Sequence, residues 1–128
     1  MGEPTFAEIL LQSAEQDLLA YCKLKTDPEI GDALLGFHAQ QAIEKSLKAV
    51  LSSAGIAFRR THDIVELMDQ IADSSLPEPP NADHLDELNP YAVEMRYGLV
   101  QPGVLDREGT HQTLDAVLNW AQESVGAQ

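Results

Sequence analysis

Apolar side chains recur at the spacing of an α-helix in five segments of the chain, separated by short polar or proline-containing connectors. The first predicted helix follows Thr5, which forms a capping-box pattern with Glu8, and it extends to about Leu24. The second covers roughly residues 28 to 53, because a proline suits the first turn of a helix and Gly55 follows as a C-terminal glycine. Both segments are long enough to be main helices of a bundle.

The next two predicted helices are separated by a proline-rich loop. The third has Thr61 as its cap and ends near Asp73. The fourth opens at Asp83 and continues to Tyr97, but Pro90 lies inside it and is expected to break or kink it.

The last predicted helix begins at about Asp106 or Thr110 and extends through Val125. No segment shows the alternation of apolar and polar residues that is typical of a half-buried strand. The sequence therefore predicts an all-α bundle in a single domain, residues 1–128. The first, second, fourth and fifth segments are its main helices, and the third is a short addition.

The segment from Phe37 to Leu51 mixes apolar, amide, acidic and basic side chains more densely than any other. Helical geometry places one set of residues on a broad arc that should face the core: Leu35, Ala39, Ala42, Ile43, Ser46, Leu47 and Val50. The opposite arc holds Phe37, Gln41, Glu44, Lys45 and Lys48, with His38 at its edge. Because a solvated face does not need a phenylalanine, we expect a second contact surface, an interface formed by Phe37, Gln41, Glu44 and Lys48.

The charge composition of the chain limits the classes of partner that it is expected to bind. The 128 residues include 8 Lys+Arg and 21 Asp+Glu, which gives a formal charge of −13. Nucleic acids and anionic membranes attract basic proteins, so we expect no strong non-specific nucleic-acid binding and a protein partner with a basic surface. No apolar stretch approaches the about 20 residues that a membrane span needs, and no signal peptide follows Met1. We therefore expect a cytoplasmic protein.

The sequence does not indicate a metal site or a cofactor. Its only cysteine, Cys22, excludes an internal disulfide and a Cys-based zinc site. The four histidines lie in different segments and lack the spacing of a ligand pair: His38, His62, His84 and His111. With no histidine near it in sequence, Cys22 is expected to be a small core or boundary residue rather than a nucleophile.

The motif Thr61-His62-Asp63 allows two interpretations. In the first it only caps a helix; in the second His62 projects from the helix N-terminus into a groove. Arg59 and Arg60 precede it, and they would bind a phosphate there or pair with acidic side chains on the surface.

Arg96 and Tyr97 are also open to two interpretations. An arginine in the last turn of a helix interacts favourably with the helix dipole. Arginine and tyrosine are, equally, the residue types favoured as anchors of an interface.

Three segments resemble, in this order, the landmarks of the HEPN (higher eukaryotes and prokaryotes nucleotide-binding) domain. They are Phe37-His-Ala-Gln-Gln-Ala-Ile-Glu-Lys-Ser-Leu-Lys-Ala49, Thr61-His62-Asp63 and Tyr91-Ala-Val-Glu-Met-Arg-Tyr97. The resemblance covers about residues 6 to 125 and implies a four-helix up-and-down bundle with a short additional helix, usually a homodimer. It also implies a two-gene module in which the HEPN protein accompanies a minimal nucleotidyltransferase. Some members are toxin ribonucleases, and the partner then acts as antitoxin.

The ribonuclease members carry an Arg and a His separated by four to six residues, and this spacing is absent from the chain. No His stands at the corresponding positions after Arg59, Arg60 or Arg96, and only three residues separate Arg107 from His111. Metal-free RNA cleavage needs an acid–base group beside a cation that stabilises the developing phosphorane. We therefore predict no catalytic residue.

The predicted function is a HEPN-like helical module that homodimerises and associates with a minimal nucleotidyltransferase in a toxin–antitoxin-type pair, with nucleotide as a further ligand. The alternative is a metal-independent ribonuclease toxin whose variant site uses Arg96 and Tyr97 together with His62 or His111. Cationic side chains would contact the phosphates of a nucleotide, and Tyr97 would contact its base. The predicted ligand-binding residues are His38, Gln41, Lys45, Lys48, His62, Arg96 and Tyr97.

Overall fold

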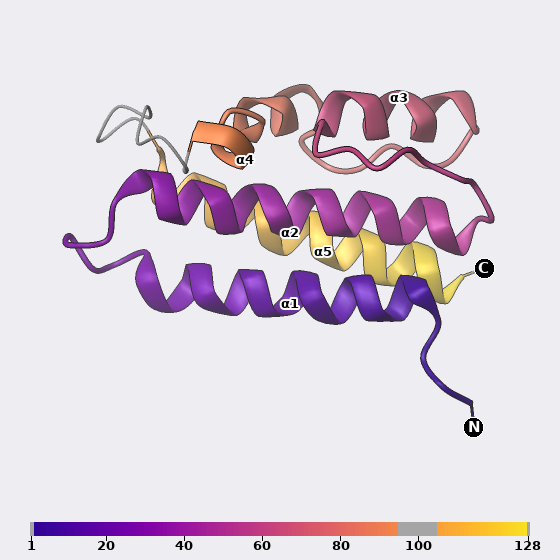
Figure 1. The fold of residues 1–128 in the computed structure, drawn as a ribbon, viewed down its shortest axis with the longest axis horizontal. Coiled ribbons are helices and arrows are strands. Elements are labelled where there is room, and N and C mark those ends of the chain that lie inside the picture. Colours follow the sequence, from indigo (N-terminus) through magenta and orange to yellow (C-terminus); the bar gives the residue numbers. More distant parts are fainter. Residues whose placement is uncertain (1, 95–104, 128) are drawn as a thin grey trace.

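The computed structural model describes residues 2–94 and 105–127 of the chain (Figure 1). Its helices are, in order, α1 Phe6–Leu24, α2 Asp32–Ser53, α3 Ile64–Asp73, the 3₁₀ helix η1 Ala82–Leu88, α4 Tyr91–Glu94 and α5 Arg107–Gly126. The described ranges contain no strand, so the all-α prediction is confirmed. Within them, no helix combines the length and the apolar composition needed to cross a membrane.

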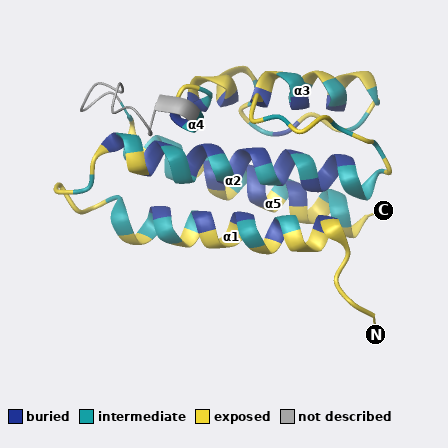
Figure 2. Cartoon of the chain, in the orientation of Figure 1, coloured by how far each residue is buried: buried dark blue, intermediate teal, exposed yellow. Residues whose placement is uncertain are grey.

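α2 is the central helix, and it touches every other helix of the described ranges. α1 and α5 pack against it and against each other, whereas α3, η1 and α4 lie on its other side (Figure 1). α1 and α2 are antiparallel, and α5 runs in the direction of α2, so the two termini lie at the same end of the molecule. α2 is consequently buried around most of its circumference (Figure 2).

Two clusters of buried side chains hold the helices together. The larger cluster surrounds α2 and joins it to Tyr21 of α1, Leu67 of α3, Leu85 of η1 and Leu114 of α5. The smaller lies between α1, α2 and α5 and is rich in alanine: Ala7, Ala14, Ala49 and Ala121. Small side chains let the backbones of these three helices approach closely, which makes them a compact unit.

Several helix ends lie where residues close to them in sequence predicted them. The Thr5 hydroxyl accepts a hydrogen bond from the Glu8 backbone N–H at 3.1 Å, and Gly55 follows α2 with a φ of +75°. At α3, however, the prediction that Thr61 is the cap is wrong. Asp63 is the N-cap and accepts from the Val65 N–H, whereas the Thr61 hydroxyl accepts from the Asp63 N–H in the preceding turn.

α2 begins later than predicted, at Asp32 instead of Pro28. The backbone carbonyls of Lys25 and Ile30 accept hydrogen bonds from the guanidinium of Arg107, which lies in the first turn of α5. These bonds hold the residues before Asp32 in a turn, because carbonyls that face α5 are not available to a helical first turn.

The fourth predicted helix is divided at Pro90, as expected. The segment before it is the 3₁₀ helix η1, and a short α4 begins at Tyr91. The Tyr91 ring lies directly against the backbone of Gly36 in α2, at a place where a Cβ atom would overlap it. Gly36, which weakens a helix in isolation, is therefore the residue that lets α4 pack against the centre of the fold.

Candidate functional site

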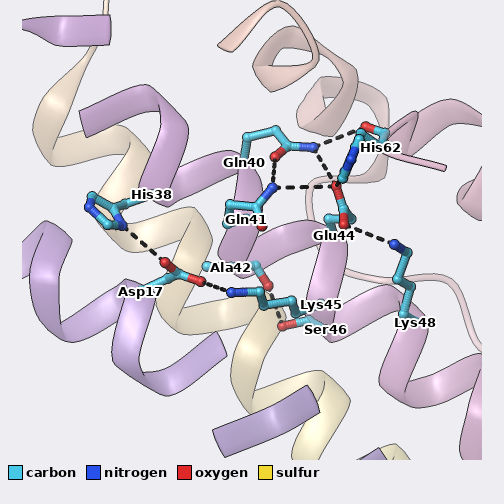
Figure 3. A network of polar contacts seen from close by, with 10 residues as sticks. All are labelled: Asp17, His38, Gln40, Gln41, Ala42, Glu44, Lys45, Ser46, Lys48 and His62. Atoms are coloured by element: carbon cyan, nitrogen blue, oxygen red, sulfur yellow. Dashed lines mark hydrogen bonds and ion pairs between the residues drawn. The ribbon is translucent and has the colours of Figure 1, made fainter. Parts of the chain in front are cut away.

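The side chains around Glu44 of α2 form a network of hydrogen bonds and ion pairs (Figure 3). Glu44 Oε1 accepts from Gln40 Nε2 at 3.0 Å and lies 2.9 Å from His62 Nδ1, and Glu44 Oε2 accepts from Lys48 Nζ at 2.9 Å. Gln40 Nε2 also donates to the backbone carbonyl of His62 at 3.0 Å. The network thus joins three turns of α2 to the connector that precedes α3.

Glu44 is only 3% exposed, so it faces the interior of the subunit. Helical periodicity alone placed it with outward-facing residues, and that orientation is wrong. Burial raises the pKa of the Glu44 carboxyl, but the hydrogen bonds from Lys48, Gln40 and His62 together outweigh burial and lower it below the ordinary value. Glu44 is therefore a stably ionised buried carboxylate.

A second network lies on the side of α2 that faces α1 (Figure 3). Asp17 of α1 is buried and lies 2.9 Å from His38 Nδ1 and 2.6 Å from Lys45 Nζ. Both partners come from α2, so the contact is an inter-helix ion pair with two basic groups around one carboxylate. It fixes His38 and Lys45 at the α1–α2 junction.

The predicted ligand-binding residues consequently fall into two groups. His38 and Lys45 lie at Asp17, whereas Lys48 and His62 lie at Glu44, with Gln41 donating to Gln40 at 2.7 Å. Arg96 and Tyr97 lie outside the described residues. The part of the chain that the structure describes therefore does not bring the predicted residues to one point, and a ligand role for them stays a prediction.

Among the predicted ligand-binding residues that the structure describes, His62 is the most accessible, with 67% of its side chain exposed. Its Nδ1 is held by Glu44, and no other protein atom of the described ranges is bonded to its Nε2. A carboxylate on one ring nitrogen fixes the orientation of an imidazole and leaves the other nitrogen for a ligand. This is an arrangement suited to binding or acid–base work, and it favours the interpretation in which His62 projects outward.

Phe37 is half-buried, but it belongs to neither of the hydrophobic clusters that residues 2–94 and 105–127 form. Its ring makes an edge contact with the imidazole of His38, with 5.7 Å between the ring centroids. Leu34, one turn before it on the same side of α2, is exposed. The outward strip of α2 therefore has an apolar part at Leu34 and Phe37, followed by Gln41 and Lys48. The predicted interface role of Glu44 is wrong, because its side chain is buried within the subunit. An interface role for Phe37, Gln41 and Lys48 stays a prediction.

The spacing of Arg107 and His111 comes nearest to the ribonuclease motif. In the structure, however, the two side chains contact different partners. Arg107 Nη2 donates to Asp32 Oδ1 at 3.0 Å and to the Ile30 carbonyl at 2.6 Å. Tyr21 donates its hydroxyl hydrogen to the Arg107 carbonyl at 2.8 Å, and burial raises the pKa of Tyr21 to about 12. Arg107 therefore ties α5 to the α1–α2 turn and does not pair with His111.

His111 lies between Lys25 and Cys22, which sequence spacing did not reveal. Lys25 Nζ is 2.7 Å from His111 Nδ1, and Cys22 Sγ is 3.1 Å from His111 Nε2. An ammonium group donates to Nδ1, which places the ring hydrogen on Nε2, so the imidazole cannot accept the thiol proton in this state. Burial and the nearby Asp115 raise the pKa of the Cys22 thiol. The arrangement does not activate Cys22.

A surface hollow of about 400 Å³ lies elsewhere, between η1 and α5. Its walls are Asn81, His84, Glu87, Leu88, Tyr91, Leu105, Asp106, Gly109, Thr110 and Thr113. None of the predicted ligand residues within the described ranges lines it. Across those ranges, no group of three or more His, Cys, Asp or Glu side chains is arranged to hold a metal ion.

Three participants in these networks were missed at the sequence level: Asp17, Gln40 and Asp32. Asp17 is a polar residue whose helical neighbours Ala14 and Tyr21 are apolar, and Gln40 lies on the same side of α2 as Leu47. Asp32 is the first residue of α2, where the pattern gives no such signal. A charged or amide group on a core-facing arc needs a buried partner. A polar residue on a core-facing arc is therefore a signal that a buried partner exists, although it does not identify the partner.

Comparison with known proteins gives two findings. The model of the HEPN domain family matches residues 7–125. The crystal structure of an archaeal HEPN homologue is similar at 24% sequence identity with a TM-score of 0.68, and the alignment covers 93% of this chain and 97% of the other. At that identity the structural likeness concerns the fold. No curated protein matches the chain.

Proposed function

Because the chain belongs to the HEPN family, we propose that it is a helical module that forms a homodimer and associates with a minimal nucleotidyltransferase in a toxin–antitoxin-type pair. The observation that carries the partner role is Phe37, a half-buried aromatic ring outside both hydrophobic clusters of the described residues. Aromatic residues at the centre of an apolar patch are the usual anchors of protein–protein interfaces. Leu34 extends the patch along α2, and the amide of Gln41 borders it.

The charge of the chain indicates the chemistry of the partner surface. With a formal charge of −13, the chain attracts a basic partner and repels an acidic one. Lys45 and Lys48 do not attract an acidic partner, because each ammonium group is paired with a carboxylate of its own subunit. We therefore expect the nucleotidyltransferase to present basic side chains around an apolar pocket for Phe37.

Co-purification tests this proposal. The tagged chain is co-expressed with a minimal nucleotidyltransferase encoded next to it, and the complex is measured by size-exclusion chromatography with light scattering. Phe37→Glu should abolish the complex, whereas Val65→Glu, which changes an exposed apolar residue of α3, should retain it. A complex that survives Phe37→Glu would contradict the role of this patch, and a chain that never binds the nucleotidyltransferase would contradict the pairing.

A second candidate function, binding or cleavage of a phosphorylated ligand at His62, is favoured by the bond between His62 and the buried Glu44. Arg59 and Arg60 lie close in sequence, and Arg59 is bonded to Glu66 at 2.6 Å. An oriented imidazole near arginines suits a phosphate group. Two experiments test this function. The first measures the melting temperature with ATP, GTP and AMP, and the second compares RNA cleavage by His62→Ala and by the parent chain. If the nucleotides do not change the melting temperature and both chains give the same RNA profile, this second function is contradicted and only the partner role remains.

A further inference from the structure

His62 is the histidine whose surroundings most favour reaction with an electrophile. Its Nδ1 lies 2.9 Å from Glu44 Oε1, and 67% of its side chain is exposed (Figure 3). An ionised carboxylate can only accept, so in the neutral ring Nδ1 carries the hydrogen and Nε2 carries the lone pair. No atom of residues 2–94 and 105–127 is hydrogen-bonded to Nε2. The ring therefore presents an oriented nucleophilic nitrogen.

Glu44 is itself held in place, which distinguishes this pair from an ordinary surface ion pair. Glu44 is 3% exposed, and its carboxylate accepts hydrogen bonds from Gln40 Nε2 at 3.0 Å and from Lys48 Nζ at 2.9 Å. Gln40 also donates to the backbone carbonyl of His62 at 3.0 Å, so it fixes both members of the pair. A nucleophile, a basic group within hydrogen-bond reach of it and a third group that orients the second form the pattern of an activated nucleophile.

The other three histidines each lack one part of this arrangement. His38 is bonded to a buried aspartate, but only 23% of its side chain is exposed. In His111 both ring nitrogens lie within hydrogen-bond distance of other side chains. His84 is 73% exposed, but its partner Glu87 is 69% exposed, so the core does not fix the orientation of that pair. The chain therefore offers one imidazole that is both accessible and oriented by a buried carboxylate.

We propose that His62 Nε2 is a phosphoryl acceptor, which reacts with small donors such as phosphoramidates and acyl phosphates. The inference rests on the second candidate function and deepens it, because it names the reaction that a phosphorylated ligand undergoes at His62. Arg60 favours a phosphoryl group over a carboxylic acyl group. It is an exposed arginine two residues before His62, and it makes no ion pair within the described ranges.

Transfer from phosphoramidate needs no further reactant. The Nε2 lone pair forms a bond to phosphorus, the P–N bond of the donor breaks, and ammonia leaves with the electron pair of that bond. Nδ1 keeps its proton, so the ring becomes positively charged, and the Glu44 carboxylate, 2.9 Å away, compensates this charge. Glu44 is thus a positioning residue, which orients the ring and stabilises the charge that develops on it.

Mass spectrometry of the parent chain incubated with potassium phosphoramidate tests the proposal. His62 should be phosphorylated at least about tenfold faster than His84, which is similarly exposed and is the control within the same chain. The two rates are compared on their plateaus above neutral pH, because Glu87 raises the pKa of His84 and keeps more of that ring protonated. Equal rates, or faster phosphorylation of another histidine, would overturn the proposal.

Two variants test the role of the carboxylate. Glu44→Gln should slow phosphorylation of His62 by roughly tenfold or more, whereas Glu87→Gln should leave it unchanged. Circular dichroism verifies that both variants are folded at the temperature of the assay, and the comparison of His62 with His84 in the parent chain needs no variant. An unchanged rate in folded Glu44→Gln would overturn the role of Glu44.

Diethyl pyrocarbonate, an uncharged electrophile, measures the nucleophilicity of the same ring without phosphate chemistry. A parent chain that reacts with it at His62 but takes up no phosphoryl group would overturn the phosphoryl class. If nucleotides raise the melting temperature of a chain that takes up no phosphoryl group, this inference fails and the second candidate function stands. If the chain neither binds nucleotides, nor cleaves RNA, nor accepts a phosphoryl group, both fail.

Discussion

Glu44 Oε1 lies 2.9 Å from His62 Nδ1, so a carboxylate in the central helix holds an exposed imidazole in the connector that precedes α3. The two residues are 18 positions apart, and Gln40 strengthens the link by donating both to Glu44 and to the His62 carbonyl. Such a bond has two consequences: the buried charge is compensated, and the imidazole has one orientation. Stability and His62 geometry therefore depend on the same carboxylate.

Replacement of Glu44 by glutamine should destabilise the fold by about 2 to 4 kcal/mol. The amide removes the charge that Lys48 needs, and the Lys48 side chain is only 13% exposed. Urea unfolding of the parent chain and of Glu44→Gln at pH 7 measures the difference. Glu87→Gln is the matched control, because Glu87 is exposed and its replacement should change stability by less than about 0.5 kcal/mol. Equal losses in the two variants would contradict a special role for Glu44.

The contribution of Glu44 should disappear in acid. Its folded-state pKa lies below the ordinary value of 4.5, because hydrogen bonds from Lys48, Gln40 and His62 outweigh the effect of burial. A depressed folded pKa stabilises the protein at pH above the unfolded pKa, and this stability is lost as pH falls through the folded pKa. The difference in unfolding free energy between the parent chain and Glu44→Gln should therefore shrink from pH 7 to pH 3. A constant difference would show that the pKa of Glu44 is not depressed.

The helix order and most helix ends could be predicted because their causes are local. Thr5, Gly55 and Pro90 act on residues within one turn, and the structure shows each of them where the sequence placed it. The start of α2 could not be predicted in the same way, because it depends on Arg107, which arrives from α5. The error at Thr61 is smaller, since Asp63, two residues later, is an equally good cap.

The candidate site was harder to predict than the fold, because it is made by contacts between distant segments. His38, Lys45, Lys48 and His62 were identified by residue type, but their common feature, a buried carboxylate partner, was not. Helical periodicity assumes one buried and one open side, whereas α2 is covered by helices on several sides. For that reason Glu44 was assigned outward, although it faces inward.

Replacement of Gly36 by alanine should destabilise the protein by about 1 to 3 kcal/mol, although alanine is the better helix former. The added Cβ would overlap the Tyr91 ring, so α4 must move away from α2. Gly126→Ala in α5 is the control, since no atom lies within 4 Å of a Cβ at that position. Thermal unfolding should show a lower melting temperature for the first variant only. The loss should largely vanish in a Tyr91→Ala background, and a loss that persists there would contradict the steric explanation.

Arg107 should be irreplaceable even by lysine. Its Nη1 donates to the Lys25 carbonyl at 2.9 Å, while its Nη2 donates to the Ile30 carbonyl and to Asp32. A lysine side chain ends in one ammonium group, which cannot donate to both carbonyls and to Asp32 at the same time. The negative charge of Asp32, whose side chain is only 5% exposed, would then lack its full set of hydrogen bonds. We expect Arg107→Lys to lower the unfolding free energy by about 2 to 3 kcal/mol in urea titrations. Arg59→Lys, at a surface pair with Glu66 in which the Arg59 side chain is 80% exposed, should leave the unfolding free energy unchanged. If the two substitutions have the same small effect, the forked contact does not hold α5 to the α1–α2 turn.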